Sequence, residues 1–368
     1  MTRHPTPNLE LFSFNDKIDG PPLPMLQDYS EKTMKDDLKS KKGMKKQGLR
    51  VLYTSYGESP VLSEYFIPLL YKHQETLENV RGCLSSLSES QVQGFYEKYS
   101  RFKLENLKHL ATWLEPGIQD FMLHTAIRGT NKISSITAVG GHDLELFLTT
   151  LMDRASLDGL NLSHMYWSGV DTTLLLIQVF NKYAKLSSSS NKGATDTTTP
   201  GSAATSLKWI KLRYCNPMVT DKVLMSLTGI KTLHDIHLGG LTSISTWGMV
   251  QMIQKLDSQI THVFLHDMFL VTDSIIVALG NLDNLPLVKL ELLEQVTNLG
   301  IRALVDKKMM TIQKLVTLEV TECKLITQDC IRYAMEKVKT VRYNSPYSEY
   351  YMTKAKNGYY VSRSAWIT

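Results

Sequence analysis

Hydrophobic residues recur in the second half of the chain as a short phrase in which apolar positions alternate with other residues. The phrase reads L-x-x-L-x-L, with Ile or Val allowed, and it begins at Leu207, Leu233, Ile260, Leu287 and Leu315. These starts are 26, 27, 27 and 28 residues apart. In LKWIKL, the first, fourth and sixth residues can face a core while Trp209 and Lys211 face outward. Each phrase therefore predicts a short β-strand.

A second pattern follows each phrase. It consists of an apolar residue, then a hydroxyl residue (Thr or Ser), then a helical run of apolar residues. It begins at Val219, Ile244, Val271, Val296 and Ile326. The hydroxyl can accept a hydrogen bond from an unpaired N–H at the start of the helix, which stabilises that start by ~1 kcal/mol. A strand and a helix repeated at this period are typical of leucine-rich repeats. We predict an α/β solenoid: a curved horseshoe with a parallel sheet on its concave face and helices on its convex face.

Similar but weaker phrases extend the series toward the N-terminus. They begin at Leu49, Leu77, Leu107, Ile133 and Leu157. The long step from Leu157 to Leu207 contains the Ser/Thr-rich stretch 187–206, whose composition predicts a disordered insertion. We expect a flexible polar segment (1–48), a solenoid of ten full units and a terminal strand (49–343), and a Tyr-rich cap (344–368). In the cap, Asn357-Gly358 predicts a hairpin that covers the open end of the last repeat.

Composition narrows the class of protein. The chain has 368 residues, of which 43% are hydrophobic, so it can bury a large core. A net charge of +5 over so large a surface does not favour nucleic acid as a partner. Four cysteines are too few for a disulfide framework and favour the cytoplasm or nucleus. The sequence has no signal-peptide pattern and no apolar run long enough for a bilayer, so we expect no membrane association.

Two of the cysteines occupy the same place in their units. Cys215 and Cys323 each lie eight residues after the start of a phrase. The equivalent positions are Met165, Leu241, Met268 and Gln295. A position that accepts these residues is typical of a buried corner, where a thiol packs and bonds weakly to a backbone carbonyl. We therefore expect a structural role rather than a catalytic or metal-binding one.

The phrase L-x-x-L-x-L-x-x-C, followed by Ile or Val, Thr, Asp and a helix, resembles the cysteine-containing repeats of F-box/leucine-rich-repeat proteins. LKWIKLRYCNPMVTDKVLMSL and LVTLEVTECKLITQDCIRYAM carry the resemblance, which covers 207–343 well and 49–185 loosely. It implies a solenoid that holds a substrate and a preceding F-box that docks on a cullin-based ubiquitin ligase. In 21–48 the sequence departs from the family, because a Leu-Pro start is not followed by F-box spacing. The lysines in 35–46 fit a nuclear import signal or, more commonly, a solvated linker.

The third, fifth and seventh residues of each phrase are expected to project from the concave sheet. The predicted partner-binding residues are Trp209, Lys211, Arg213, His237, His262, Phe264, His266, Glu291 and Glu319. The seventh place of the unit at Leu287 falls on Leu293. A cationic and aromatic patch thus grades into an acidic one, which either anchors a protein ligand or is the ordinary mixed surface of a curved sheet. The histidines and Asp235 have no metal-ligand spacing, and proton-dependent binding is the better hypothesis for them.

The sequence lacks the motifs of common enzyme classes. It has no Gly-rich phosphate loop, no H-E-x-x-H and no G-x-S-x-G. We therefore expect a non-enzymatic, monomeric protein–protein interaction module without cofactors. Through the family resemblance it would recognise substrates for a cullin-based ligase, whose subunits would be further partners. The alternative is a leucine-rich-repeat adaptor or regulator, similar to an inhibitor or GTPase regulator, with no ligase connection.

Overall fold

The structure is a computed structural model that describes only part of the chain. The described residues are 11–14, 48–54, 63–82, 103–113, 132–140, 144–165 (except 155), 170–189, 206–344 (except 257–258 and 312–313), 350–355, 358–363 and a few single positions. The chain forms two compact units, Met1–Ile133 and Ser134–Thr368. Among the described residues, no helix has both the length and the apolar character that a membrane crossing requires.

In the described part of the first unit, four parallel strands pair in chain order. They are β1 (Leu11–Phe14), β2 (Val51–Thr54), β3 (Asn79–Gly82) and β4 (His109–Trp113), and α2 (Ser63–Lys72) lies between β2 and β3. The apolar residues of the weak phrases are buried here, including Leu52, Val80 and Leu110. Strand β1 corrects the expectation that all of 1–48 is a flexible segment. The stretch Leu9-x-x-Phe12-x-Phe14 repeats the phrase with aromatic residues, which a search for aliphatic residues overlooks.

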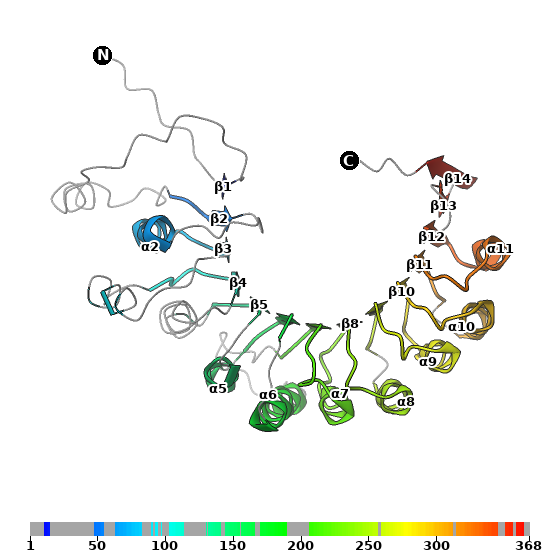
Figure 1. Ribbon diagram of the computed structural model, residues 1–368, viewed down its shortest axis with the longest axis horizontal. Helices are drawn as coiled ribbons and strands as arrows, with labels where there is room; N and C mark the ends of the chain where they lie inside the picture. Colours follow the sequence, from blue (N-terminus) through cyan, green and yellow to red (C-terminus); the bar gives the residue numbers. More distant parts are fainter. Residues whose placement is uncertain are drawn as a thin grey trace, which may run out of the picture. The chain divides into compact units, whose positions relative to one another are not determined.

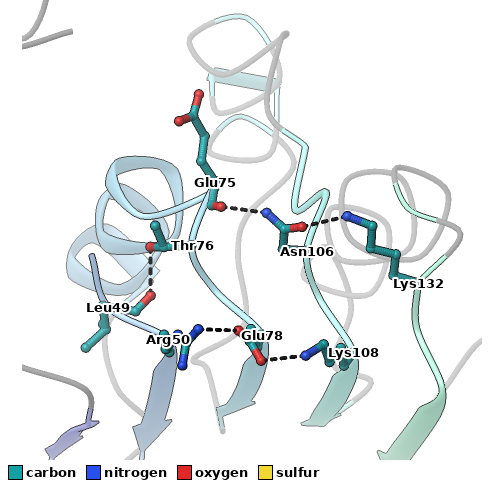
Figure 2. A network of polar contacts seen from close by, with 8 residues as sticks. All are labelled: Leu49, Arg50, Glu75, Thr76, Glu78, Asn106, Lys108 and Lys132. Atoms are coloured by element: carbon teal, nitrogen blue, oxygen red, sulfur yellow. Dashed lines mark hydrogen bonds and ion pairs between the residues drawn. The ribbon is translucent and has the colours of Figure 1, made fainter. Parts of the chain in front are cut away.

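Polar side chains connect successive repeats of the first unit (Figure 2). The Glu78 carboxylate lies between Arg50 (3.4 Å) and Lys108 (2.7 Å), which precede β2 and β4. The Asn106 amide donates to the Glu75 carbonyl (2.6 Å) and its oxygen accepts from Lys132 (2.6 Å). Exposed pairs of this kind contribute little singly, but here they join three consecutive strands at the same edge.

The second unit repeats strand and helix more regularly. Its parallel strands are β5 (Ser135–Val139), β6 (Gly159–Ser163), β7 (Trp209–Arg213), β8 (Asp235–Gly239), β9 (His262–His266), β10 (Leu287–Glu291), β11 (Thr317–Thr321) and β12 (Thr340–Asn344). Its helices are α5 (Leu144–Asp153), α6 (Val170–Ser189), α7 (Asp221–Leu227), α8 (Thr246–Lys255), α9 (Asp273–Leu279), α10 (Asn298–Met310) and α11 (Gln328–Lys337). In this unit the strands line the inner side of an arc and the helices its outer side (Figure 1). The predicted α/β repeat architecture is confirmed.

The core of the second unit lies between the sheet and the helices. Residues at the fourth and sixth places of each phrase, such as Ile210 and Leu212, are buried, and so is the inner face of α7 with Val223 and Leu224. The alternate residues face away from the helices and are mostly half-buried. The period of two in the sequence thus separates a packed face from a free face of the sheet.

The unit predicted to begin at Leu287 begins two residues earlier, at Leu285. Leu287 pairs with His262 and Thr317, which are third-place residues, and it is half-exposed. Leu293 is therefore buried at the corner of this unit, the place that Cys215 occupies in its own unit. The predictions that Leu293 projects from the free face and that Gln295 occupies the corner are wrong. The error arose because LPLVKLEL fits the phrase from either leucine. A shift of two residues preserves alternation, so Glu291 remains on the free face.

The predicted corner thiols are buried. The Cys215 Sγ donates to the carbonyl oxygen of Leu162 at 3.3 Å, and Cys323 is equally inaccessible. Burial raises the pKa of Cys215 to about 12 and the pKa of Cys323 to about 11. Both thiols are therefore protonated at neutral pH, and this agrees with the structural role inferred from their spacing.

The predicted helix caps are present in three of the five units. Ser245, Thr297 and Thr327 accept hydrogen bonds from the N–H groups of Gly248, Leu299 and Cys330. Thr220 and Thr272 make no such bond, although their backbone has the extended cap conformation. In those two units the next residue is an aspartate, Asp221 or Asp273, whose carboxylate binds the cap residue of the following unit.

The ends of the insertion are packed rather than loose. Helix α6 extends to Ser189, so the predicted insertion 187–206 begins inside a helix. Ser187 accepts a hydrogen bond from the Lys231 N–H, and buried Ser206 donates to the Tyr183 carbonyl. Residues 190–205 lie outside the described part of the chain.

At the C-terminal end, β13 (Tyr350–Ala355) pairs antiparallel with β12 and with β14 (Gly358–Arg363).

Candidate protein-binding face of the parallel sheet

All nine predicted partner-binding residues lie on the free face of the second unit. They come from β7 to β11, and the strand register places equivalent residues side by side. The row at the fifth place consists of Lys211, His237, Phe264, Lys289, Glu319 and Arg342. Most of these side chains are half-buried, but His266 in the adjacent row is only 7% exposed. The alternation in sequence thus predicted a contiguous surface.

Aromatic rings form the centre of this face. Phe264 contacts His237 edge-on, with ring centroids 5.3 Å apart, and it contacts His266 at 6.0 Å. Tyr214 continues the series, because its hydroxyl lies 3.0 Å from His266 Nε2 and donates to Asp267 at 3.0 Å. His164 stacks on Tyr214 with a centroid distance of 4.7 Å. The rings therefore run across four strands and their loops as one connected group.

Tyr214 and His164 were not predicted as site residues. They occupy the eighth place of the repeat, directly after each strand, and their backbone is left-handed with φ of 53° and 54°. The same place holds Gly140, Gly240, Asp267, Leu292 and Glu322, all with positive φ. Gly140 and Gly240, which occupy this place in other repeats, could have indicated from the sequence that the backbone is left-handed here. Glycine is the usual residue in this conformation.

Trp209 has a structural contact in addition to its place on the face. Its ring covers Gly159 of the neighbouring strand, so closely that an added Cβ on Gly159 would lie 1.8 Å from a ring atom. Trp209 is half-buried by this contact. Trp209 thus packs against the β6 backbone and also lies on the face predicted to bind a partner.

Three cations lie over aromatic rings of the face. Lys289 Nζ is 4.3 Å from the Phe264 centroid, Lys211 Nζ is 5.8 Å from that of Trp209, and Arg213 is 6.0 Å from that of Tyr214. Within the described part of the chain, neither Lys211 nor Arg213 forms an ion pair with a carboxylate. Burial, and secondarily Arg213, lowers the pKa of Lys211. These two cations are available to an acidic group of a ligand.

The acidic side of the face is largely paired. Glu291 lies 3.0 Å from Lys289 and 3.6 Å from His266, and Glu319 lies 2.6 Å from Arg342. Asp235 pairs with the ring of His262. Along the strands, the cationic residues are followed by the acidic residues in the predicted order. The free charge of the face, however, is concentrated at the cationic end.

Two histidines of the face are held in the neutral form. Burial, followed by the nearby charge of Lys211, lowers the pKa of His237 to about 4. Burial and Arg213 also lower the pKa of His266, and these effects outweigh the opposite influence of Glu291. At neutral pH both rings act as polar aromatic surfaces. Proton-dependent binding through His237 would therefore occur well below the usual range of histidine.

Among the residues that the structure describes, no three His, Cys, Asp or Glu side chains are grouped to hold a metal ion.

Comparison with models of protein families finds no matching family, and comparison with curated proteins finds no matching relative. The class of the protein therefore follows from its architecture: a solenoid-like series of parallel strands and helices, in whose second unit the described helices leave one face of the sheet uncovered.

Proposed function

We propose that the protein is a non-enzymatic binding module that recognises a protein ligand on the free face of β7 to β11. The observation that carries this proposal is the continuous ring system from Tyr214 to Phe264 beside Lys211 and Arg213, which form no ion pair with a carboxylate among the described residues. Aromatic residues and arginine concentrate binding energy at protein interfaces. Charge pairing across the interface would orient an acidic segment of the ligand over the two cations.

Charge reversal tests the role of the face. Lys211→Glu replaces one of the two cations proposed to bind the acidic segment and should weaken ligand binding by about tenfold or more, measured by calorimetry with a captured ligand. Lys222→Glu is the matched control, because Lys222 is exposed on helix α7, away from the sheet face. Equal binding by Lys211→Glu and the wild type would exclude the cationic end of this face as the ligand site.

The more specific proposal is substrate recognition for a cullin-based ubiquitin ligase. It is supported by the repeat phrase around Cys215 and Cys323, which resembles that of F-box/leucine-rich-repeat proteins. Affinity capture of the full chain followed by mass spectrometry is the test. Cullin-ligase subunits should co-purify with both the wild type and Lys211→Glu, whereas the substrate should be lost from the variant.

A leucine-rich-repeat adaptor or regulator is the second candidate. The observation that favours it is the sequence 21–48, which lacks F-box spacing after its Leu-Pro start. In this case the same capture would return a ligand that depends on Lys211, but it would return no ligase subunit. The ligase proposal would then be rejected, while the binding role of the sheet face would stand.

A further inference from the structure

A second concave feature lies outside the sheet face, at the edge where the strands end. A hollow of about 260 Å³ crosses four successive repeats, from the loop after β7 to the loop after β10. Its lining includes the eighth-place residues Tyr214, Gly240, Asp267 and Leu292, and the tenth-place residues Phe269 and Glu294. The repeat places equivalent residues in line, so the hollow is a short groove along the loops.

Exposed apolar side chains continue along this edge. Trp247, Phe269, Leu299 and Leu325 are 69%, 48%, 74% and 51% exposed. They come from four consecutive repeats, and each lies in the loop after a strand or at the start of the helix that follows. Hydrogen bonds between repeats hold these segments together: Thr246 bonds the Leu270 carbonyl at 2.9 Å, and Asn298 bonds Thr327 at 3.1 Å.

These hydrogen bonds place Trp247 beside the loop that carries Phe269. They likewise bring Leu299 toward the segment after β11 that carries Leu325. An isolated exposed apolar residue is ordinary. Here, exposed apolar residues occur in four consecutive repeats, either at the start of a helix or in the loop after a strand, and such a grouping is typical of an interaction surface. The row and the groove therefore belong to one edge, and we call them together the loop edge.

The charge of the loop edge is acidic. Asp267 and Glu294 line the groove, and its lining contains no lysine or arginine. Hydrogen bonding to Lys324 lowers the pKa of Glu294, so this carboxylate is ionised at neutral pH. Glu322 continues the eighth-place row into the next repeat. A ligand for this edge therefore needs positive charge together with apolar side chains.

The dimensions of the groove also restrict the ligand. Small-molecule sites usually enclose roughly 300 to 1,000 Å³, and this groove is smaller and open. It suits one or two side chains of an extended segment, while the apolar row offers places for the neighbouring side chains.

We infer that the loop edge is a second interaction surface, which binds a peptide segment of a partner protein carrying Lys or Arg next to apolar residues. The basic side chain would lie beside Asp267, which forms no ion pair in the described part of the chain, and near Glu294, which Lys324 already pairs at 2.6 Å. The apolar neighbours would pack on Phe269 and Trp247. This surface adjoins the cationic sheet face through Tyr214 and Asp267, which also line the groove, but its acidic charge has the opposite sign. The inference does not depend on the function proposed above.

Selection of peptides from a random displayed library on the full chain tests the inference. One group of enriched peptides should carry Lys or Arg beside Leu, Ile, Phe or Trp, distinct from any acidic peptides that bind the sheet face. The affinity of the basic peptides, measured by fluorescence polarisation, should fall about tenfold for Phe269→Ser, Trp247→Ser and Glu294→Lys. Two apolar variants are included in case Phe269→Ser impairs folding. Trp247 is more exposed than Phe269, so Trp247→Ser should disturb the fold less.

Met310→Ser is the matched control, since Met310 is 90% exposed but lies at the end of α10, away from the loop edge. It should leave the affinity unchanged, and so should Lys211→Glu on the sheet face. The inference is overturned if the library yields no peptides beyond a blank surface, or if none of the enriched peptides carries Lys or Arg beside apolar residues. It is also overturned if the basic peptides lose affinity only with Lys211→Glu or equally with Met310→Ser.

Discussion

At the scale of single residues, two adjacent glycines determine how the rings of the sheet face pack. An added Cβ on Gly239 would lie 3.2 Å from His266, and one on Gly240 would lie 2.1 Å from the Tyr214 ring. Gly240 also has a φ of +58°, a conformation that favours glycine. Because neither glycine has a side chain, the Tyr214 ring can pass over the repeat of β8. Its hydroxyl forms hydrogen bonds with His266 and Asp267 in the repeat of β9.

Gly240→Ala should therefore destabilise the protein strongly. The left-handed backbone costs an alanine roughly 1–2 kcal/mol, and displacement of the Tyr214 ring adds roughly 1–3 kcal/mol. We expect a clearly lower thermal midpoint, measured by circular dichroism. Gly94→Ala is the control, because nothing lies within 4 Å of the added Cβ and φ is ordinary. If the two variants melt at the same temperature, the Tyr214 ring does not depend on Gly240.

At the scale of elements, two pairs of successive helices, α7–α8 and α9–α10, are joined by a pairing of aspartate and glycine. Asp221, the first residue of α7, accepts hydrogen bonds from the N–H and hydroxyl of Ser245 at 2.7 and 2.6 Å. Gly248, the third residue of α8, leaves room for this carboxylate, since an added Cβ would lie 2.1 Å from it. Asp273 and Gly300 repeat the arrangement one pair of helices later. Each carboxylate thus needs a glycine in the next repeat.

This pairing can be measured by a double-mutant cycle. Asp221→Ala removes two hydrogen bonds to a charged acceptor and should cost roughly 2–4 kcal/mol of stability in urea unfolding. Gly248→Ala should be destabilising in the wild type but close to neutral in the Asp221→Ala background, where alanine is the better helix former. Asp329→Ala is the control, because that side chain is 81% exposed. Additive effects of the two substitutions would mean that the carboxylate and the glycine are independent.

The elements also show what the sequence could and could not predict. Strands with aliphatic phrases were found because burial of alternate residues requires that pattern, even in the weak unit at Leu49. Strand β1 was missed because Phe12 and Phe14 replace aliphatic residues. The unit at Leu285 was misplaced because Leu287 offers an equally good start. The contribution of Tyr214 to the site was missed because it depends on backbone conformation and on glycines in another repeat, which no local pattern records.

At the scale of the whole molecule, the protein is built so that each repeat of a unit pairs with its neighbours in sequence. This leaves the problem of the last repeat, whose strand would otherwise expose unpaired backbone groups. In the second unit β12 does not end the sheet, because β13 pairs with it antiparallel from Val341 to Asn344 and β14 pairs with β13. The chain thus changes from parallel repeats to an antiparallel hairpin after β12.

Truncation after Asn344 should reveal the role of this hairpin. Without β13, the backbone N–H and C=O groups of β12 that now pair with it would be open to other strands, including those of a second copy of the chain. We expect a lower thermal midpoint and concentration-dependent association, measured by light scattering after size-exclusion chromatography. Truncation after Arg363 keeps both strands of the hairpin and serves as the control. A chain ending at Asn344 that stays monomeric and equally stable would show that β12 is protected by its own short length, and that the hairpin serves some other purpose.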